Sequence, residues 1–369
     1  MARRTILFAG GGTGGHLYPG LAIARTLVRL APDVQPIFVG AQRGIERTVL
    51  PASEFPHLLL DLHPLYRARP WENWRTIRGA IGAWREMGAL VRREQPRVVV
   101  GTGGYAAGVA LAYAVRHHIP IVQQAGDSHP GLTARAFKRW TREYYLNFPE
   151  AGGVIGGEAS KFLDTGAPIE PPPEPRPDRA AARRAWGFPE QGGHVLLIYG
   201  GSQGSLAINR VVADWVKRGL PDGLFVIWMT GRASYSEFAS LDSDRVKVRE
   251  YLSPIADAYA AADLALARAG AMTTSELFAW RIPGVLVPLP TAAADHQTAN
   301  AKALEAAGAA INLPQAELAV DRLDATVRSL LADPSAMARL AAGAAARARP
   351  NAAVTIARRI LAMMDTPRD

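Results

Sequence analysis

Five glycines and a histidine follow the first apolar stretch of the chain, and their types and spacing could support chemistry on an anion. Residues 5–9 form an apolar run typical of a β-strand, residues 10–15 read GGGTGG, and residues 19–30 have helical spacing. Glycine lets the backbone approach a ligand closely, and a helix start presents unpaired N–H groups. We therefore expect a phosphate-type ligand at Thr13, Gly14 and Gly15, with the His16 imidazole at the mouth of the loop.

The same glycines also fit a dinucleotide fingerprint, Gly10-x-Gly12-x-x-Gly15. A site for NAD requires an acidic residue after the second strand. The second predicted strand, residues 35–39, runs instead through Gly40 into Ala41-Gln42-Arg43. The sequence therefore disfavours a nicotinamide or flavin enzyme.

A second glycine loop appears about 190 residues after the first. Residues 195–199 predict a strand, residues 200–204 read GGSQG, and residues 205–218 predict a helix.

Farther on, Glu276 stands early in another predicted helix. It could accept hydrogen bonds from both hydroxyls of a ribose, or it could simply be an acid that favours a helix start.

Gln297 and Asn300 are three residues apart in a predicted helix, so they share one face. Amide side chains in this arrangement could bind sugar hydroxyls.

The elements between these motifs alternate between short apolar strands and helical stretches, which predicts parallel sheets covered on both faces. Residues 166–177, GAPIEPPPEPRP, are too rich in proline to continue either element and predict a linker. We expect an N-terminal Rossmann-like domain over residues 1–165 and a second one over 166–349, facing each other across a cleft. An amphipathic helix within 350–369 could return to either domain, and we assign it to the first. The predicted strands are residues 5–9, 35–39, 58–62, 97–100, 119–123, 143–146, 195–199, 224–229, 246–248, 264–267 and 285–287.

Charge is unevenly distributed along the 369 residues. Residues 1–165 hold 20 Lys and Arg against 12 Asp and Glu, which is +8 of the total net charge of +9. This predicts that the first half meets a membrane surface, a nucleic acid or a phosphorylated substrate. A nucleic acid is disfavoured because no binding motif accompanies the charge.

Cysteine is absent and the eight histidines show no HxH or HExxH spacing, which disfavours disulfides and a metal site. The uncharged run 98–115 could be mistaken for a membrane span. Four glycines interrupt it, and it reads better as a strand, a loop and a helix. The sequence also shows no signal peptide, so we expect a protein that is soluble or attached to a membrane surface.

An aromatic stripe stands within residues 66–93. Its members follow helical spacing with arginines beside them, which is typical of a helix lying in a membrane interface. An ordinary helix facing the core is the alternative. The stripe comprises Trp71, Trp74, Ile77, Ile81 and Trp84, with Arg75, Arg78 and Arg85 beside it.

Taken together, these segments resemble the MurG family, membrane-associated transferases that move N-acetylglucosamine from UDP to lipid-linked muramyl-pentapeptide. The resemblance covers nearly the whole chain, and the ordered pair GGTGGH and GGSQG is its most specific part. It implies a GT-B fold, an inverting mechanism without a metal or cofactor, a role in peptidoglycan synthesis and cell division, and a peripheral location on the cytoplasmic face of the membrane. The matching segments are residues 11–22, 44–46, 103–105, 130–133, 148–151, 200–204, 268–276 and 297–301.

The resemblance also implies roles for individual residues. His16 and Asp127 correspond to acceptor-side catalytic positions, with His16 the candidate base or the group that positions the acceptor hydroxyl at muramyl C4. Ser202 and Gln203 would lie by the diphosphate of UDP-N-acetylglucosamine, the donor substrate. Glu276 would bind the ribose, and Gln297 and Asn300 would contact the sugar. The backbone of Ala271, Met272 and Thr273 would lie near the diphosphate and sugar.

Two segments depart from the family pattern. Gln124-Ala125-Gly126-Asp127 stands where the family carries His-Glu-Gln-Asn, and Gly166-Ala167-Pro168-Ile169-Glu170 stands where it carries Gly-Asn-Pro-Val-Arg. These departures keep two alternatives open. One is a related transferase with another lipid or small-molecule acceptor, and the other is a catalytically silent paralogue that binds a UDP-sugar. An epimerase acting on UDP-sugars on the same fold is less favoured.

Overall fold

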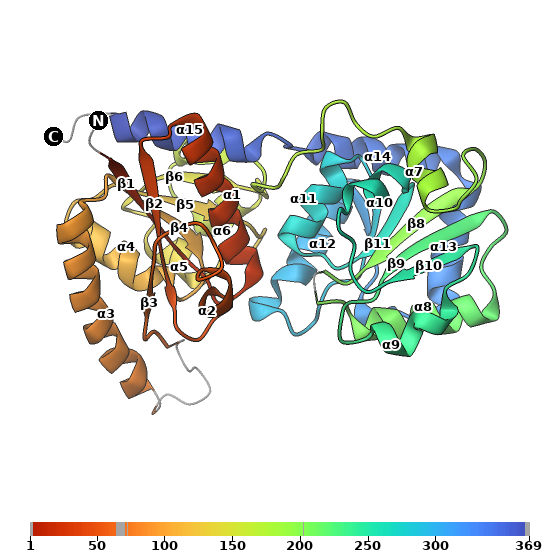
Figure 1. Cartoon of the computed structure of the whole chain (residues 1–369), viewed down its shortest axis with the longest axis horizontal. Helices are drawn as coiled ribbons and strands as arrows, with labels where there is room; N and C mark the ends of the chain where they lie inside the picture. Colours follow the sequence, from red (N-terminus) through yellow and green to blue (C-terminus); the bar gives the residue numbers. More distant parts are fainter. Residues whose placement is uncertain (1–2, 64–70, 72, 202, 366–369) are drawn as a thin grey trace. The chain divides into compact units, whose positions relative to one another are not determined.

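Two compact units make up the chain (Figure 1). The computed structural model describes residues 3–63, 71, 73–201 and 203–365, without the side chains of residues 73 and 75–77. The first unit combines Met1–Glu170 with Asn351–Asp369, and the second unit is Pro171–Pro350.

A seven-stranded parallel sheet forms the centre of the first unit, in the order β3-β2-β1-β4-β5-β6-β7. The order reverses between β1 and β4, and in such sheets ligands bind where the strands end at this reversal. The strands are β1 (Arg4–Gly10), β2 (Val34–Ala41), β3 (His57–Leu60), β4 (Val98–Gly103), β5 (Ile121–Ala125), β6 (Thr141–Leu146) and β7 (Phe162–Asp164). The helices are α1 (Gly14–Leu30), α2 (Glu46–Val49), α3 (Asn73–Glu94), α4 (Ala107–Arg116), α5 (Leu132–Ala136), α6 (Ala151–Ile155), the 3-10 turn η2 (Ala159–Lys161) and α15 (Ala352–Asp365).

Side chains of β1 alternate between two core layers, as the twofold period of a strand requires. Ile6 and Phe8 pack with residues of α1 and α15, whereas Leu7 and Ala9 pack with residues of α3 and α4. Helix α15 lies beside α1 in Figure 1, and Ile356 is fully buried in their shared layer. The last helix is therefore part of the core of the first unit.

The second unit repeats this design with a six-stranded parallel sheet in the order β10-β9-β8-β11-β12-β13. Its reversal lies between β8 and β11. The strands are β8 (His194–Tyr199), β9 (Leu224–Met229), β10 (Val246–Arg249), β11 (Leu264–Ala267), β12 (Gly284–Leu286) and β13 (Ala310–Asn312). The helices are α7 (Arg179–Ala185), α8 (Leu206–Arg218), α9 (Tyr235–Phe238), α10 (Ala256–Ala261), α11 (Ala271–Ala279), α12 (His296–Ala306), α13 (Val320–Ala332) and α14 (Pro334–Arg347), with 3-10 turns η3 (Ala239–Leu241), η4 (Ala293–Asp295) and η5 (Gln315–Glu317).

Each of the eleven strands predicted from the sequence overlaps a strand of the structure, while the three-residue strands β7 and β13 were not predicted. The predicted start of the first helix, residue 19, is wrong, because α1 begins at Gly14. Two glycines hide the helical period by lacking side chains, yet glycine can adopt helical backbone angles. His16 therefore lies in the first turn of α1 instead of in the loop.

Candidate active site

The first glycine loop packs against the end of the neighbouring strand β4. The Gly11 N–H donates to the Gly103 carbonyl at 3.2 Å. Gly104 has φ +77°, and a Cβ built there would lie 2.0 Å from the Gly11 carbonyl oxygen. Only glycine allows the two loops to approach this closely. The ends of β1 and β4 thus form one side of the site, at the strand-order reversal of the first sheet.

The His16 ring is held by the loop that precedes it. Its Nδ1 lies 3.1 Å from the Gly11 carbonyl oxygen and 3.2 Å from Thr13 Oγ1. A carbonyl oxygen can only accept, so a hydrogen bond to Gly11 places the proton on Nδ1 and leaves the lone pair on Nε2. A Cβ built on Gly103 would lie 3.0 Å from that Nε2. This arrangement suits His16 to take a proton at Nε2.

The other predicted residues of the first site lie at the same edge of the sheet. Gly14 and Gly15 open the first turn of α1 and are half-buried and exposed, respectively. Asp127 is half-buried and follows the carboxyl end of β5, the strand next to β4. Gln124, at the end of β5, is 3% exposed, and within the described chain neither of its amide atoms has a hydrogen-bond partner.

In the second unit, the second glycine loop lines a cavity of about 400 Å³ between the ends of β8 and β11. Ser205 caps α8, its Oγ accepting from the Ile208 N–H at 3.4 Å. Gly270 caps α11, whose first residues are Ala271, Met272 and Thr273. Two helix starts therefore lie at one cavity, an arrangement that favours an anion. The lining residues are Gly200, Gly201, Gly204, Ser205, Leu206, Ala207, Arg268, Gly270, Thr273, Leu289, Gln297 and Gln315.

Arg268 supplies a full positive charge to the wall of this cavity. Arg268 is 7% exposed, and its guanidinium donates to Ser205 Oγ and Gln315 Oε1 at 2.7 Å, and to the carbonyls of Val287 and Pro288 at 3.1 Å. All four of these acceptors are neutral. Burial lowers the pKa of Arg268, because a charged group loses its hydration there. A bound anion would restore the missing stabilisation of the charge.

Arg268 and Gln315 were missed as site residues from the sequence. Arg268 carried a detectable signal, since it is the first charged residue after the apolar strand β11 and stands at its carboxyl end. Gln315 carried none, because it lies in a short 3-10 turn far along the chain.

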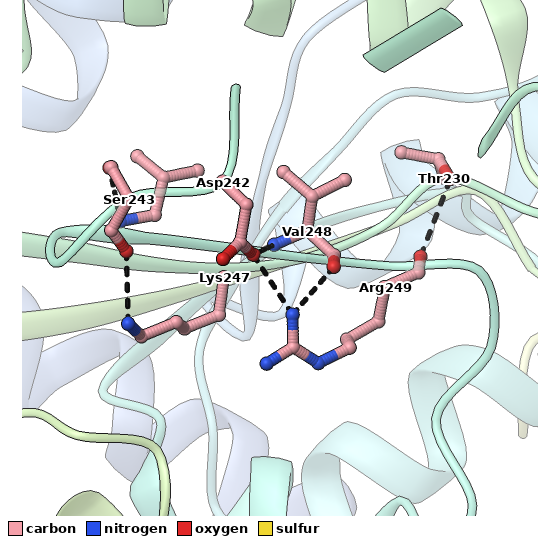
Figure 2. A network of polar contacts seen from close by, with 7 residues as sticks. Thr230, Asp242, Ser243, Lys247, Val248 and Arg249 are labelled. Carbon is pink, nitrogen blue, oxygen red and sulfur yellow. Dashed lines mark hydrogen bonds and ion pairs between the residues drawn. The ribbon is translucent and has the colours of Figure 1, made fainter. Parts of the chain in front are cut away.

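The second glycine loop, residues 200–204, packs against Thr230, which follows β9. A Cβ on Gly204 would lie 2.0 Å from the Thr230 carbonyl oxygen, which also accepts from Asn209 Nδ2 at 2.8 Å. Figure 2 shows the network that fixes Thr230: its Oγ1 donates to the Arg249 carbonyl at 3.3 Å. Asp242 in turn accepts from Arg249 Nη1 at 2.9 Å and from the Val248 N–H at 2.8 Å.

The remaining predicted residues of the second site differ in their surroundings. Gln203 is exposed, and Ser202 lies outside the described residues. Gln297 lines the cavity, and its Oε1 accepts from the Leu289 N–H at 3.0 Å. Asn300 is fully buried and donates from Nδ2 to the Ala269 carbonyl at 3.1 Å, next to Gly270 in the cavity wall. The structure thus gives Asn300 a supporting position beneath the wall.

Glu276 lies in the second turn of α11 and is half-buried. Its Oε2 accepts a hydrogen bond of 2.9 Å from the Tyr259 hydroxyl. At the other departure from the family pattern, Glu170 is exposed, and its charge contributes to raising the pKa of Arg25, for which a hydrogen bond to Glu54 is the main cause.

The described side chains of the aromatic stripe lie on the surface of the first unit. Ala83, Met87 and Leu90 make the core-facing side of α3. Arg78 and Arg85 are exposed, whereas the side chains of Arg75 and Ile77 lie outside the described residues. The exposed fractions of the stripe are 72% for Trp71, 55% for Trp74, 56% for Ile81 and 38% for Trp84.

Trp71, Trp74 and Ile81 therefore do not face the core, whereas the Trp84 ring packs partly against the buried Tyr113, with ring centroids 4.9 Å apart. Among the described residues, no helix is long and apolar enough to cross a bilayer.

Comparisons with known proteins agree with this architecture. Residues 6–146 match the glycosyltransferase family 28 N-terminal domain, and residues 195–356 match the family 28 C-terminal domain. The crystal structure of MurG from Acinetobacter baumannii aligns with a TM-score of 0.77 and 26% identity, over 97% of this chain and 99% of that one. A kitacinnamycin glycosyltransferase aligns with a TM-score of 0.72 and 18% identity over 99% and 100% of the chains, which shows the fold alone. Fold and matches together define a glycosyltransferase of the two-domain GT-B class.

Relatives that align over nearly the whole chain show which family of glycosyltransferases it belongs to. A protein of Salinibacter ruber is 40% identical over 98% of both chains, and one of Chlorobaculum parvum is 36% identical over 97% of this chain and 99% of the relative. Both are named UDP-N-acetylglucosamine–N-acetylmuramyl-(pentapeptide) pyrophosphoryl-undecaprenol N-acetylglucosamine transferase. The chain belongs to this family, the MurG transferases.

Proposed function

We propose that this chain transfers N-acetylglucosamine from UDP-N-acetylglucosamine to the C4 hydroxyl of lipid-linked N-acetylmuramyl-pentapeptide, the step from lipid I to lipid II in peptidoglycan synthesis. The shared name of its full-length relatives supports both substrates. The structural observation that carries the proposal is the cavity of the second unit, where a buried arginine and two helix starts suit a diphosphate.

The donor half of the proposal assigns the diphosphate to Arg268 and to the backbone N–H groups at the starts of α8 and α11. Positive charge and fixed dipoles at these positions would stabilise the negative charge that develops on the departing UDP. Glu276 would accept hydrogen bonds from the ribose hydroxyls, and Gln297 would contact the sugar. Gln203 and the segment Ala271–Thr273 are proposed to lie along the same donor.

The acceptor half assigns general-base catalysis to His16. The acceptor oxygen forms a bond to C1 of N-acetylglucosamine while the bond from C1 to the diphosphate oxygen breaks, with inversion at C1. The hydroxyl proton moves to Nε2 of His16, and UDP leaves with the bonding electron pair. Contacts of Nδ1 with Gly11 and Thr13 support this assignment, because they orient the ring for a base at Nε2. Asp127, Gly14 and Gly15 are proposed to help bind the acceptor.

We also propose that the protein is peripheral on the cytoplasmic face of the membrane. The exposed tryptophans and arginines of α3 support this, because aromatic rings favour the interface and arginines attract anionic lipids. Such a location would bring the enzyme to its lipid-linked acceptor.

The test is a transfer assay with UDP-N-acetylglucosamine and a synthetic lipid-linked muramyl-pentapeptide. Wild type should form the product glycosylated at C4, and His16→Ala should lower turnover by about two to four orders of magnitude while UDP affinity changes only a few-fold. His57→Ala, at an exposed histidine of the same unit, is the control.

If the protein transfers the sugar to a different acceptor and not to the muramyl lipid, the proposed acceptor is wrong and the other acceptor takes its place. The departures at Ala125 and Glu170 make this comparison necessary. Binding of UDP-N-acetylglucosamine without any transfer would support a silent paralogue.

A further inference from the structure

Two buried tyrosines connect the interior of the second unit to Glu276. The Tyr259 hydroxyl donates to Glu276 Oε2 at 2.9 Å, and the Tyr199 and Tyr259 hydroxyls are 3.2 Å apart. Tyr199 is 3% and Tyr259 4% exposed. The two rings come from different elements, the end of β8 and helix α10.

The hydrogen bonds of this chain can run in only one direction when Glu276 is ionised. A carboxylate only accepts, so Tyr259 commits its proton to Glu276, and Tyr199 must then donate to the Tyr259 oxygen. Burial raises the pKa of both tyrosines, and the negative charge of Glu276 raises them further, so both remain donors at neutral pH. Chains of hydrogen bonds of this kind polarise and strengthen one another.

We propose that Tyr259, supported by Tyr199, is a positioning residue that holds the Glu276 carboxylate for the ribose and thereby determines selectivity for a ribonucleotide donor. The inference rests on the role proposed above for Glu276 and names the groups on which that role depends.

Side-chain entropy explains why a half-buried glutamate benefits from such a partner. A free Glu side chain loses rotamer freedom when it is ordered, which costs free energy. Tyr259 orders the carboxylate before the nucleotide arrives, so less is lost on binding. A carboxylate has about four acceptor sites on its two oxygens, so one bond from Tyr259 is compatible with bonds from the ribose hydroxyls.

The experiment is calorimetric titration with UDP and with 2′,3′-dideoxy-UDP, which lacks both ribose hydroxyls. Tyr259→Phe removes one hydroxyl and keeps the ring, whose centroid lies 5.7 Å from that of the Trp280 ring. We expect UDP affinity to fall about 10-fold in this variant, in line with the loss of a hydrogen bond to a charged group, while dideoxy-UDP affinity stays unchanged. Tyr199→Phe should give a smaller loss, and Glu276→Ala should abolish the preference for UDP.

A matched control comes from the first unit. Tyr145 is fully buried and its hydroxyl donates to Glu143 Oε2 at 3.0 Å, so Tyr145→Phe removes the same kind of bond away from the nucleotide site. Tyr145→Phe should lower Tm and leave both affinities unchanged. Equal losses for UDP and dideoxy-UDP in Tyr259→Phe would overturn the positioning role in favour of a purely structural one.

Two further outcomes separate this inference from the proposed function. If wild type binds UDP and dideoxy-UDP equally, the ribose role of Glu276 is wrong, and the positioning role fails with it. If wild type prefers UDP and Tyr259→Phe keeps or increases that preference, only the positioning role is overturned. A single cooperative thermal transition of Tyr259→Phe verifies that the variant is folded.

Discussion

The Glu46 carboxylate lies against Gly11 so closely that a Cβ built on Gly11 would be 1.8 Å from Glu46 Oε1. Glu46 is fully buried, and the same oxygen accepts from the Ala41 N–H at 3.2 Å. A Cβ built on Gly44 would likewise lie 1.9 Å from Oε2. The first glycine loop therefore rests on a buried carboxyl group from α2, and the absence of side chains at Gly11 and Gly44 makes room for it.

Gly11→Ala should destabilise the protein by about 1–3 kcal/mol, because the added methyl must displace the buried Glu46 side chain. Thermal unfolding measures the effect. The control is Gly82→Ala in α3, where a Cβ meets nothing within 4 Å and a helical alanine should leave Tm equal or higher. Equal Tm values for wild type and Gly11→Ala would show that Glu46 yields without cost.

Arg268→Gln should weaken UDP binding by about 10- to 100-fold, because the buried positive charge that is proposed to stabilise the diphosphate is lost. Uridine, which has no diphosphate, should bind both proteins about equally. Titration of both ligands distinguishes loss of charge from loss of structure. Arg232→Gln removes an exposed arginine of the same unit, paired with Glu250, and should change neither affinity. Parallel losses for uridine and UDP would contradict the diphosphate role.

The exposed stripe should bind vesicles that contain anionic lipid, and salt should weaken that binding because its electrostatic part is screened. For the double variant Trp71→Ser/Trp74→Ser, we expect most of the protein to stay in the supernatant instead of co-sedimenting with the vesicles. Trp140→Ser removes another exposed tryptophan of the first unit, 51% exposed, and should have little effect. Undiminished binding of the double variant would exclude the stripe as the membrane contact.

An ion pair that joins β6 to α15 predicts a dependence on pH. Arg359 donates to Glu143 at 2.9 and 2.5 Å, and this hydrogen bond is the main cause that lowers the pKa of Glu143. A carboxyl group with a lowered pKa stabilises the fold above its unfolded value, about 4.3, and loses this contribution as the pH falls through the folded value. Arg359→Gln should therefore lower Tm at pH 7, with the difference from wild type shrinking towards pH 3.

The neighbouring exposed residue offers the control for this titration. Arg358→Gln removes an equal charge from α15 and should lower Tm little at any pH. A difference between wild type and Arg359→Gln that does not change between pH 7 and pH 3 would show that Glu143 is not the group responsible.

Local pattern in the sequence was sufficient to predict most strands of the two sheets, although not β7 and β13. Buried parallel strands appear in the sequence as short apolar runs. The unit of strand, glycine loop and helix start is likewise contained in one short stretch, as at residues 5–16 and 195–205. Eleven strands and the two glycine loops could therefore be found without knowledge of any long-range contact. The start of α1 could not be predicted in this way, because Gly14 and Gly15 contribute no side chain to the helical period.

Only the tertiary structure decided which distant groups meet. The Arg268 guanidinium reaches Ser205, 63 residues earlier, and Arg359 reaches Glu143 across 216 residues, which places α15 in the first unit. The face of α3 that carries Trp74 could equally have packed inward by its pattern. Whether a charge is neutralised or an aromatic face is covered depends on segments far apart in the chain, and these are brought together only when the sheets and helices pack.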